Sequence, residues 1–172
     1  MQSLVITIVG PDRPGLVESL SRTIAAHGGS WVESSLSHLA GQFAGVVRAT
    51  VEDGSAVALQ QALTALTTEA LHVVVQRGVA AKDAEPRKTI ELDLVGADRP
   101  GIVQAVSRAL AELGVNVESL ETACEGAPMS GELLFKAAAT LHLPGDLPVR
   151  NVRAAIEAVA ADLMVDITLK DD

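Results

Sequence analysis

An internal repeat constrains the fold of this chain more than any other sequence feature. The segment Val9–Val17 has the sequence Val-Gly-Pro-Asp-Arg-Pro-Gly-Leu-Val, and Val95–Val103 has the sequence Val-Gly-Ala-Asp-Arg-Pro-Gly-Ile-Val, 86 positions later. The same offset aligns Gly28 with Gly114. Similarity held in one register over this distance indicates two copies of one structural unit in tandem.

Further along the chain the offset between the copies becomes 92, which pairs Phe43 with Phe135. The second copy therefore holds six extra residues, which we assign to a loop within Glu125–Gly131. Between the copies, Gly78 to Arg87 contains charged residues and a proline without hydrophobic periodicity, which is typical of a linker. The sequence predicts a first domain at residues 1–78, a linker at 79–87 and a second domain at 88–172.

Apolar residues in each copy change between a spacing of two, typical of strands, and a spacing of three to four, typical of helices. Their order predicts a strand, a helix, a hairpin of two strands, a second helix and a last strand. In the first copy the residues that predict these five elements are, in order, Leu4 to Ile8, Leu16 to Ile24, Trp31–Leu39 with Gln42–Glu52, Leu59 to Leu66, and Leu71 to Val75. In the second copy the matching elements rest on Ile90 to Leu94, Val103 to Leu113, the strands around the inserted loop, Val152 to Leu163, and Val165 to Leu169.

The order βαββαβ, twice over, predicts an α+β fold of two tandem ferredoxin-like domains. With right-handed crossovers, each domain is an antiparallel sheet that carries both helices on one face. Units of about 80 residues bury only a modest part of their surface, so we expect the two copies to pack together as a pseudo-dimer.

The second predicted strand begins at Trp31 and lies at an edge of its sheet. Trp31, Val32 and Leu36 could join this sheet to another copy, because an edge strand presents unpaired backbone groups. Ordinary packing against the core of its own copy explains the same residues. The sequence leaves both interpretations open.

The charge of the chain argues against direct contact with nucleic acid. Asp and Glu number 22 against 13 Lys and Arg, which gives a net charge of −9 and an isoelectric point near 4.8. An acidic protein repels phosphates, and aromatic residues at 2% leave few surfaces on which bases can stack. No apolar run reaches the length that spans a bilayer, and the N-terminus lacks a leader pattern, so we expect a cytoplasmic protein without membrane contact.

The sequence predicts no catalytic or metal site. The four histidines form no i, i+4 pair and no cluster with cysteine. Cys124 is the single cysteine, and no base stands near it in the sequence. We therefore expect neither an enzyme nor a cofactor.

The turn between the first strand and the first helix of each copy is the candidate binding site. The first backbone N–H groups of a helix lack intrahelical acceptors and suit an anion such as an amino-acid carboxylate. Asp12 or Asp98 could take the ammonium group of the same ligand, and Arg13 or Arg99 could bind a carboxylate oxygen. This arrangement would hold both charges of an amino acid.

A structural interpretation of the same turns competes with ligand binding. Asp12 and Asp98 could simply cap the helices, a role in which Asp is common and which we therefore favour for these two residues. The prolines at 14 and 100 would then set the first helical turn, and the glycines at 15 and 101 would relieve crowding against the sheet.

These motifs, Gly10–Gly15 and Gly96–Gly101, each leading into a helix that ends at glycine, resemble the signature of the ACT domain. Gly114-Val115-Asn116-Val117 resembles the Gly-x-Asn-Ile segment with which that family enters its second strand, whereas the first copy has Ser30 in place of Asn. The resemblance implies the following ligand-binding residues: Asp12, Arg13, Pro14, Gly15, Leu16, Asp98, Arg99, Pro100, Gly101, Ile102 and Asn116.

A pair of such domains without an attached enzyme is similar to the group of glycine cleavage system transcriptional repressors. The resemblance implies a non-catalytic regulator that binds a small amino acid, glycine first of all. It implies that the regulator controls a separate DNA-binding transcriptional activator by protein contact. The sequence leaves the oligomeric state open, with a homo-oligomer as one alternative. An ACT-type sensor or adaptor that regulates a metabolic enzyme is the alternative.

Overall fold

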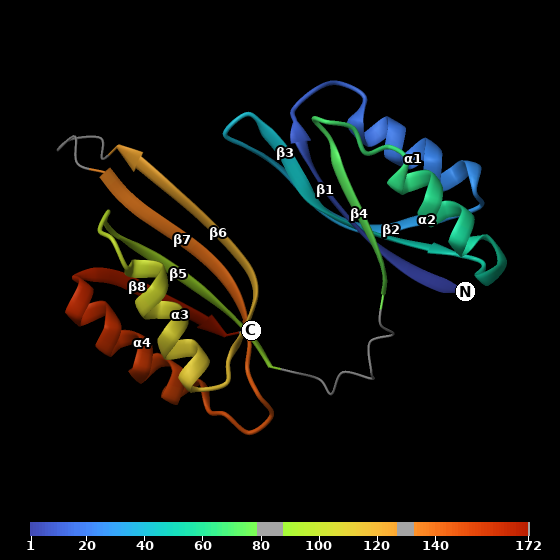
Figure 1. Cartoon of the computed structure of the whole chain (residues 1–172). Helices are drawn as coiled ribbons and strands as arrows, with labels where there is room; N and C mark the ends of the chain where they lie inside the picture. The colour runs from blue at the N-terminus through green and yellow to red at the C-terminus, as the bar shows by residue number, and fades with distance from the viewer. Residues whose placement is uncertain (79–87, 127–132, 172) are drawn as a thin grey trace. The chain divides into compact units, whose positions relative to one another are not determined.

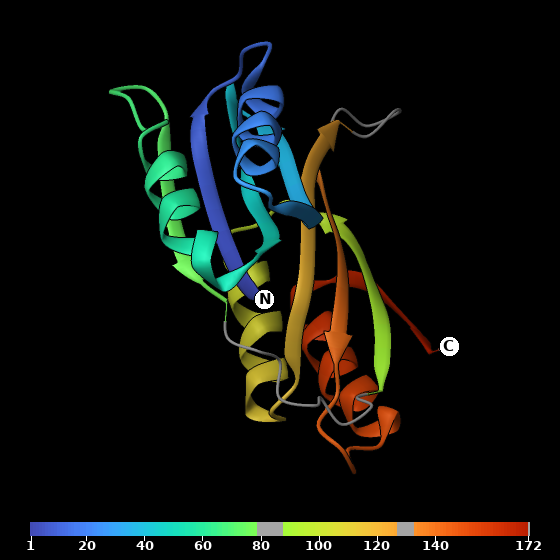
Figure 2. The same ribbon diagram turned by 90° about the vertical axis from the view of Figure 1, so that its right-hand side faces the viewer.

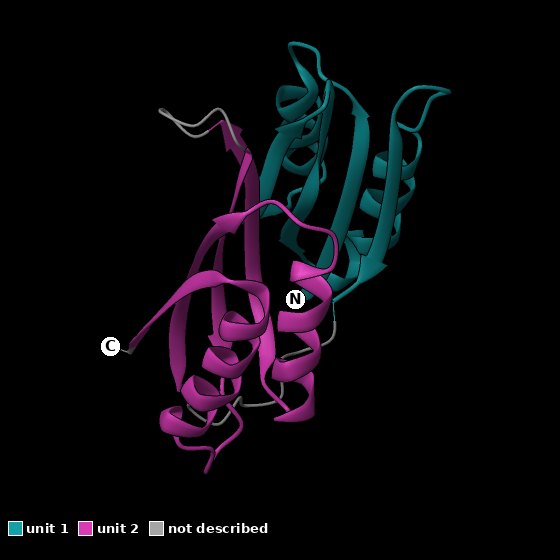
Figure 3. Cartoon of the chain, turned by 90° about the vertical axis from the view of Figure 1, so that its left-hand side faces the viewer, with its two compact units in different colours: residues 1–82 teal, residues 83–172 magenta. Residues whose placement is uncertain are grey.

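The computed structural model describes residues 1–78, 88–126 and 133–171 of the chain. The chain divides into two compact units, unit 1 (Met1–Lys82) and unit 2 (Asp83–Asp172), which Figure 3 colours separately. The predicted linker at 79–87 and residues 127–131 of the predicted inserted loop lie outside the described residues. The predicted packing of the two copies against each other stays a prediction.

Unit 1 has the predicted order of elements around one antiparallel sheet (Figure 1). The sheet has the strand order β2-β3-β1-β4, so β2 and β4 are its edges. Its elements are β1 (Gln2–Pro11), α1 (Leu16–Ala26), β2 (Ser30–Leu39), β3 (Gln42–Val51), the short 3-10 helix η1 (Asp53–Ser55), α2 (Ala56–Thr64) and β4 (His72–Arg77).

Unit 2 repeats this architecture with the strand order β6-β7-β5-β8 (Figure 2). Its elements are β5 (Thr89–Ala97), α3 (Ile102–Glu112), β6 (Asn116–Gly126), β7 (Leu133–His142), α4 (Val149–Leu163) and β8 (Val165–Asp171). The edge strands β2 and β6 even share an irregularity, with register shifts at Trp31/Glu33 and Val117/Ser119. The predicted fold class, two tandem ferredoxin-like domains, is confirmed.

Each unit has its own hydrophobic core between its helices and one face of its sheet. In β1 the alternate residues Leu4, Ile6 and Ile8 are at most 1% exposed, and the helix α1 adds Leu20 and Ile24. Burial of one such side chain stabilises the fold by about 1.5–3 kcal/mol. The second core repeats the pattern with residues of β5, α3, β7, α4 and β8.

The first helix of each unit ends at the predicted glycine. Gly28 has φ 70° and Gly114 has φ 68°, a left-handed conformation that glycine adopts without steric cost. The next backbone N–H bonds back into the helix, from Gly29 to the carbonyl of Ile24 in α1, and α3 ends in the same way. These stops set the points at which β2 and β6 enter their sheets.

Candidate functional site

The two predicted binding turns lie at equivalent places, at the end of the sheet where the neighbouring hairpin turns. The backbone N–H of Asp12 donates to the carbonyl of Gly41 at 3.1 Å, next to the hairpin turn between β2 and β3. In unit 2 the N–H of Asp98 donates to the carbonyl of Leu133 at 2.9 Å, at the start of β7. Each turn is thus held on one side by a hydrogen bond.

Glycine, not aspartate, occupies the N-cap of both helices. Gly15 has φ 92° and Gly101 has φ 97°, and neither helix has a side-chain hydrogen bond at its cap. The capping interpretation of Asp12 and Asp98 is therefore wrong. The last residue before each helix is a glycine in the left-handed conformation, and the aspartate lies three positions before it. A side chain that caps a helix normally belongs to the N-cap residue itself, in the β region, so the aspartates are not placed to cap.

The prediction that the cap glycines relieve crowding against the sheet is wrong, because the crowded position is a different glycine of each motif. A Cβ atom at the N-cap glycine would meet no atom within 4 Å in either unit. A Cβ at Gly10, by contrast, would lie 2.9 Å from the carbonyl oxygen of Ala70, and one at Gly96 would overlap the side chain of Val165. The prolines lie before the caps, since the helices begin at Leu16 and Ile102, and so they do not form the first helical turn.

The start of each helix presents free backbone donors. The first hydrogen bond of α1 runs from the N–H of Ser19 to the carbonyl of Gly15 at 2.9 Å, and that of α3 runs from Ala105 to Gly101 at 2.9 Å. The three N–H groups before each bond have no intrahelical acceptor. Together with the positive end of the helix dipole, they can bind a carboxylate.

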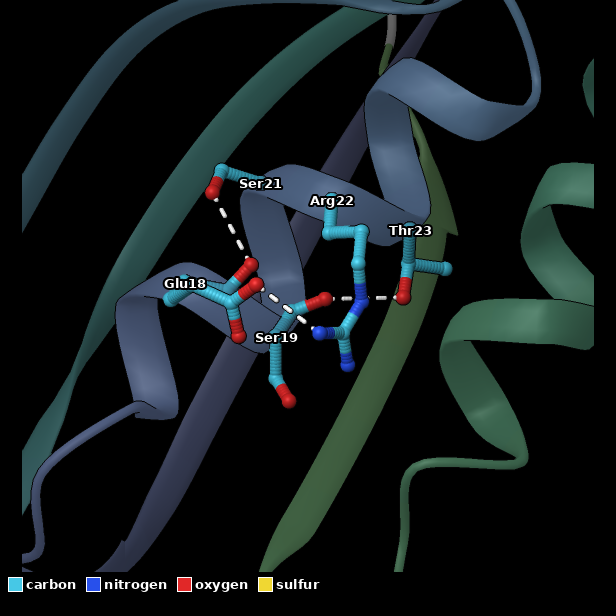
Figure 4. A network of polar contacts seen from close by, with 5 residues as sticks. All are labelled: Glu18, Ser19, Ser21, Arg22 and Thr23. Carbon is cyan, nitrogen blue, oxygen red and sulfur yellow. Dashed lines mark hydrogen bonds and ion pairs between the residues drawn. The ribbon is translucent and has the colours of Figure 1, made fainter.

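The two helix starts differ in charge. Glu18 lies in the first turn of α1 and forms an ion pair with Arg22 at 2.8 Å, as Figure 4 shows. The first turn of α3 carries no acidic residue. Arg108, which matches Arg22, pairs instead toward the end of its helix, with Glu112 at 2.9 Å. A bound anion thus meets a carboxylate near the start of α1 but none in the first turn of α3.

The charged residues of the turns are open to a ligand. Asp12, Arg13, Asp98 and Arg99 are exposed, as are the Pro and Gly residues that follow them. Among the residues that the structure describes, these four side chains form no ion pair. Acid and base stand side by side in each turn, the combination that a zwitterionic amino acid requires.

The side chains of three other residues of the predicted site do not lie at the turns. The side chains of Leu16 and Ile102 are 6% and 2% exposed and belong to the two cores, so only their backbone N–H groups face a ligand. Asn116 begins β6 and pairs with His142, which in turn pairs with Thr89 at the start of β5. The binding turn of unit 2 follows the other end of β5, so Asn116 and the turn lie about 26 Å apart along the strand. Unit 2 therefore does not bring Asn116 to its turn.

Sequence reasoning missed an apolar cavity in unit 2. It has a volume of about 30 Å³ and lies between α3 and the sheet. The helix contributes Ile102, Val103, Val106, Ser107 and Leu110, and the sheet contributes Leu92, Leu94, Val117, Leu120, Phe135, Ala137 and Ala139. Val117 matches Trp31 of unit 1, because the two residues pair with Ala49 and Leu141 at the repeat offset of 92. The sequence signal that could have indicated this cavity was the small Val117 at the position where the first copy has Trp31.

Trp31 itself is half-buried and packs against the core of unit 1. This position fits the packing interpretation. Val32, at the register shift of β2, is 44% exposed. A role for this edge between copies stays a prediction.

The described residues include no group of three or more His, Cys, Asp or Glu that could hold a metal ion. Cys124 is exposed on β6. In the described part of the chain, no helix has the length and apolar character needed to cross a membrane.

The family follows from the repeat, the fold and a match to family models. Models described as the ACT domain match residues 2–76 and 90–161. The chain belongs to the ACT domain family and carries two ACT domains in tandem.

Relatives along almost the whole chain refine this class. The chain is 22% identical over 163 residues to the glycine cleavage system transcriptional repressor of Escherichia coli K12, a match that covers 93% of this chain and 85% of the relative. A solved structure described as an unknown protein from Galdieria sulphuraria has a TM-score of 0.81 and 30% identity, with 99% of this chain and 98% of that chain covered. Another, described as a candidate glycine cleavage system transcriptional repressor, has a TM-score of 0.71 at 19% identity and shares the fold, with 98% and 96% covered.

The ACT domains and this relative support a regulatory role in amino-acid sensing. Most of the chain is accounted for by the two ACT domains, and the named relative is a transcriptional regulator rather than an enzyme.

Proposed function

We propose that this protein is a non-catalytic regulator that binds a small amino acid, glycine or a close analogue, at its helix starts. It controls a DNA-binding transcriptional activator through protein contact. The observation that carries the proposal is the pair of equivalent turns, each with an exposed Asp-Arg pair and free backbone donors. The similarity to a glycine cleavage system transcriptional repressor supports the choice of ligand and partner.

The chemistry of the turn matches a zwitterion. The carboxylate of the ligand accepts hydrogen bonds from the first N–H groups of the helix, and the arginine of the turn donates to a second oxygen. The aspartate of the turn accepts a hydrogen bond from the ammonium group. A ligand with one charge alone uses half of these partners and binds more weakly.

The charge of the chain explains why a protein partner is proposed rather than DNA. A net charge of −9 opposes approach to a phosphate backbone. Control of transcription then requires contact with a protein that binds DNA itself. For the ligand to act as a switch, its affinity must differ between the free and partner-bound forms, and a coupling free energy of about 1–3 kcal/mol is typical.

Calorimetric titration of the full chain with glycine, alanine and serine tests ligand binding. The variants Arg13→Ala and Arg99→Ala should each remove binding at one turn. The matched control Arg108→Ala removes an exposed arginine of α3 that lies outside the turn. Absence of binding by all three amino acids would reject the proposed sensor.

A pull-down compared with a gel shift on promoter DNA tests the mode of action. The proposal requires that the chain retain a DNA-binding activator, with glycine changing the amount retained, and that it not shift promoter DNA alone. Retention of a metabolic enzyme instead would favour an ACT adaptor of metabolism. A direct shift of the DNA would contradict the proposal.

A further inference from the structure

We infer that the sheet face of unit 2 opposite α3 and α4 binds a basic segment of the DNA-binding partner. An arginine or lysine side chain of that segment lies in an acidic hollow over β5, β7 and β6. The inference rests on the proposed function for the class of partner, and it adds the surface and the chemistry of the contact. The turns that bind the amino acid are not part of this surface.

The hollow lies on the face of the sheet that does not pack against the helices. Its residues on β5 alternate with the buried Ile90, Leu92 and Leu94, so their side chains point to the opposite face. Its volume is about 230 Å³. Pockets that hold whole small molecules have roughly 300–1,000 Å³, so this one suits a single side chain. Two rows across β5, β7 and β6 form it, one with Glu91, Thr140 and Ser119 and the other with Asp93, Ala138 and Glu121.

The charge of the hollow attracts a cation. Three of the described residues that line it are carboxylates, and none is basic. Glu91 and Glu121 are exposed, and within the described part of the chain neither forms an ion pair. The small side chain of Ala138 separates Asp93 from Glu121, which stand two strand spacings apart, or about 10 Å. A cationic group over Ala138 is flanked by carboxylates, and a hollow lined by one sign of charge concentrates that field.

Lys170 of the chain itself shows that this surface holds an ammonium group. It pairs with Glu91 across β5 and β8 and donates a hydrogen bond to Asp93 at 2.7 Å. That hydrogen bond, followed by the charge of Asp93, raises the pKa of Lys170, and the charge of Glu91 acts in the same direction. Lys170 thus neutralises Asp93 from the side of β8, whereas Glu121, on the side of β6, keeps its charge free for a partner.

Unit 1 has a hollow at the equivalent place, but its charges are balanced within the chain. Arg48 stands where unit 2 has Thr140, and its guanidinium donates to Glu33 at 2.7 and 3.1 Å. Unit 1 therefore supplies its own guanidinium, and unit 2 has carboxylates without one. The positions of Glu91, Asp93 and Glu121 are occupied in unit 1 by Val5, Thr7 and Ser35.

A DNA-binding partner carries the basic groups that fit this hollow. Proteins contact the phosphates of DNA with arginine and lysine side chains. A segment of that kind, held on the acidic face of unit 2, is no longer available to phosphates. The chain and promoter DNA then compete for one surface of the activator, which lets an acidic protein control transcription without touching DNA.

Fluorescence anisotropy of a dye-labelled Arg-Gly-Arg-Gly-Arg peptide, titrated with the full chain, tests the surface. The sheet variant, Glu91→Gln with Glu121→Gln, should bind the peptide about threefold or more weakly, because two partners of exposed ion pairs are lost. Thr140→Arg, which copies unit 1, should weaken binding at least as much by placing a guanidinium in the hollow. Added salt should weaken binding by the unmodified chain.

A matched variant separates the hollow from the net charge of the chain. The helix control, Glu157→Gln with Asp162→Asn, removes the same number of charges at exposed positions of α4. It should leave peptide binding within about twofold of that of the unmodified chain. Thermal melts check the fold of each variant, and glycine binding by the sheet variant should be unchanged because the hollow lies outside the turns.

Pull-down of the DNA-binding activator extends the test from the peptide to the protein partner. The sheet variant should retain about threefold less activator than the unmodified chain, and the helix control should retain a normal amount. Promoter DNA added to the complex should release the activator from the unmodified chain, because both bind the same basic surface.

The other outcomes overturn the inference. A peptide that does not bind the unmodified chain does so, as does an equal loss of binding in the sheet variant and the helix control, which assigns the binding to net charge. Full retention of the activator by the sheet variant also overturns it and leaves the proposed function standing. If the unmodified chain retains no DNA-binding protein, the proposed function fails and the inference fails with it.

Discussion

Units 1 and 2 share the same strands, helices and binding turn but differ beside the first helix. In unit 1, Trp31 of β2 packs against the core, and Glu18 lies in the first turn of α1. Unit 2 has Val117 at the edge of a cavity and no acidic residue in the first turn of α3. The sequence Asp-Arg-Pro-Gly of the turn is the same in both units, whereas the residues in the first turn of the helix and at the start of the edge strand differ.

The sheet faces opposite the helices differ as well. Unit 1 exposes the valines Val9, Val46 and Val74 beside the Glu33–Arg48 ion pair of β2 and β3. The same face of unit 2 exposes Val95, which matches Val9, and has ion pairs from Lys170 to Asp93 and from Lys136 to Glu125, each at 2.7 Å. The difference shows that this face tolerates both apolar and charged residues in the same backbone.

The largest effects should come from the cores, at matched positions. Ile6→Ala and Leu92→Ala should each lower the free energy of unfolding by about 2–5 kcal/mol, because both side chains are at most 3% exposed. Leu92 already borders the cavity, so we expect its loss to lie at the lower end. Urea unfolding followed separately in the two units, by the Trp31 fluorescence and by amide exchange, measures both. A larger loss for Leu92→Ala than for Ile6→Ala would contradict the expectation that the cavity beside Leu92 reduces the packing of this side chain.

The cap glycines should respond equally in both units. Gly15→Ala and Gly101→Ala each place a Cβ in the left-handed region, and we expect a loss of about 1–2 kcal/mol of stability together with weaker amino-acid binding. Gly54→Ala, at a glycine with free space and no positive φ, is the control and should change stability little. Thermal melts and ligand titrations of the three variants provide the measurement. Normal stability in both cap variants would show that the turn does not need its left-handed residue.

The second helices end differently, and this predicts a stabilising change in unit 2 alone. Met164 ends α4 at φ 55° and is 67% exposed, whereas Ala65 ends α2 at φ −66°. Met164→Gly should raise the free energy of unfolding by roughly 0.5–1 kcal/mol, since glycine adopts positive φ without steric cost. Ala65→Gly should lower stability by a similar amount. Thermal melts that show both variants destabilised would contradict the conformation of Met164.

The smallest effect concerns pH and the charged pair of unit 1. Hydrogen bonds from Arg48 at 2.7 and 3.1 Å, followed by its charge, hold the pKa of Glu33 below its ordinary value of 4.5. A lowered pKa stabilises the fold above pH 4.5, and this contribution is lost as the pH falls through the lowered value. The stability difference between the unmodified chain and Glu33→Gln should therefore shrink in acid, and added salt should reduce it because both groups are exposed.

Unit 2 supplies the matched control for this pH effect. The equivalent positions hold Ser119 and Thr140, whose hydroxyl groups lie 2.9 Å apart and carry no charge. Ser119→Ala should change stability by the same amount at every pH between 3 and 7. Denaturation curves across that range test both units, and an equal pH dependence of the two variants would contradict the account.

The sequence predicted the elements well because the repeat and the hydrophobic periodicity are local signals. The helix stops at Gly28 and Gly114 depend on neighbouring residues only and were also predictable. The capping role of Asp12 failed because it depends on the path of the turn, which Gly15 redirects through positive φ. The cavity depends on how α3 lies over strands from distant parts of the sequence, so the small size of Val117 alone did not reveal it.

The central claim is that both helix starts bind an amino acid, and backbone amide NMR of the full chain tests it most directly. On titration with glycine, we expect the amide signals of residues 16–18 and of residues 102–104 to shift, because their N–H groups lie at the two helix starts. Saturating amino acid that leaves both groups of signals in place, or moves only signals remote from them, would contradict the account.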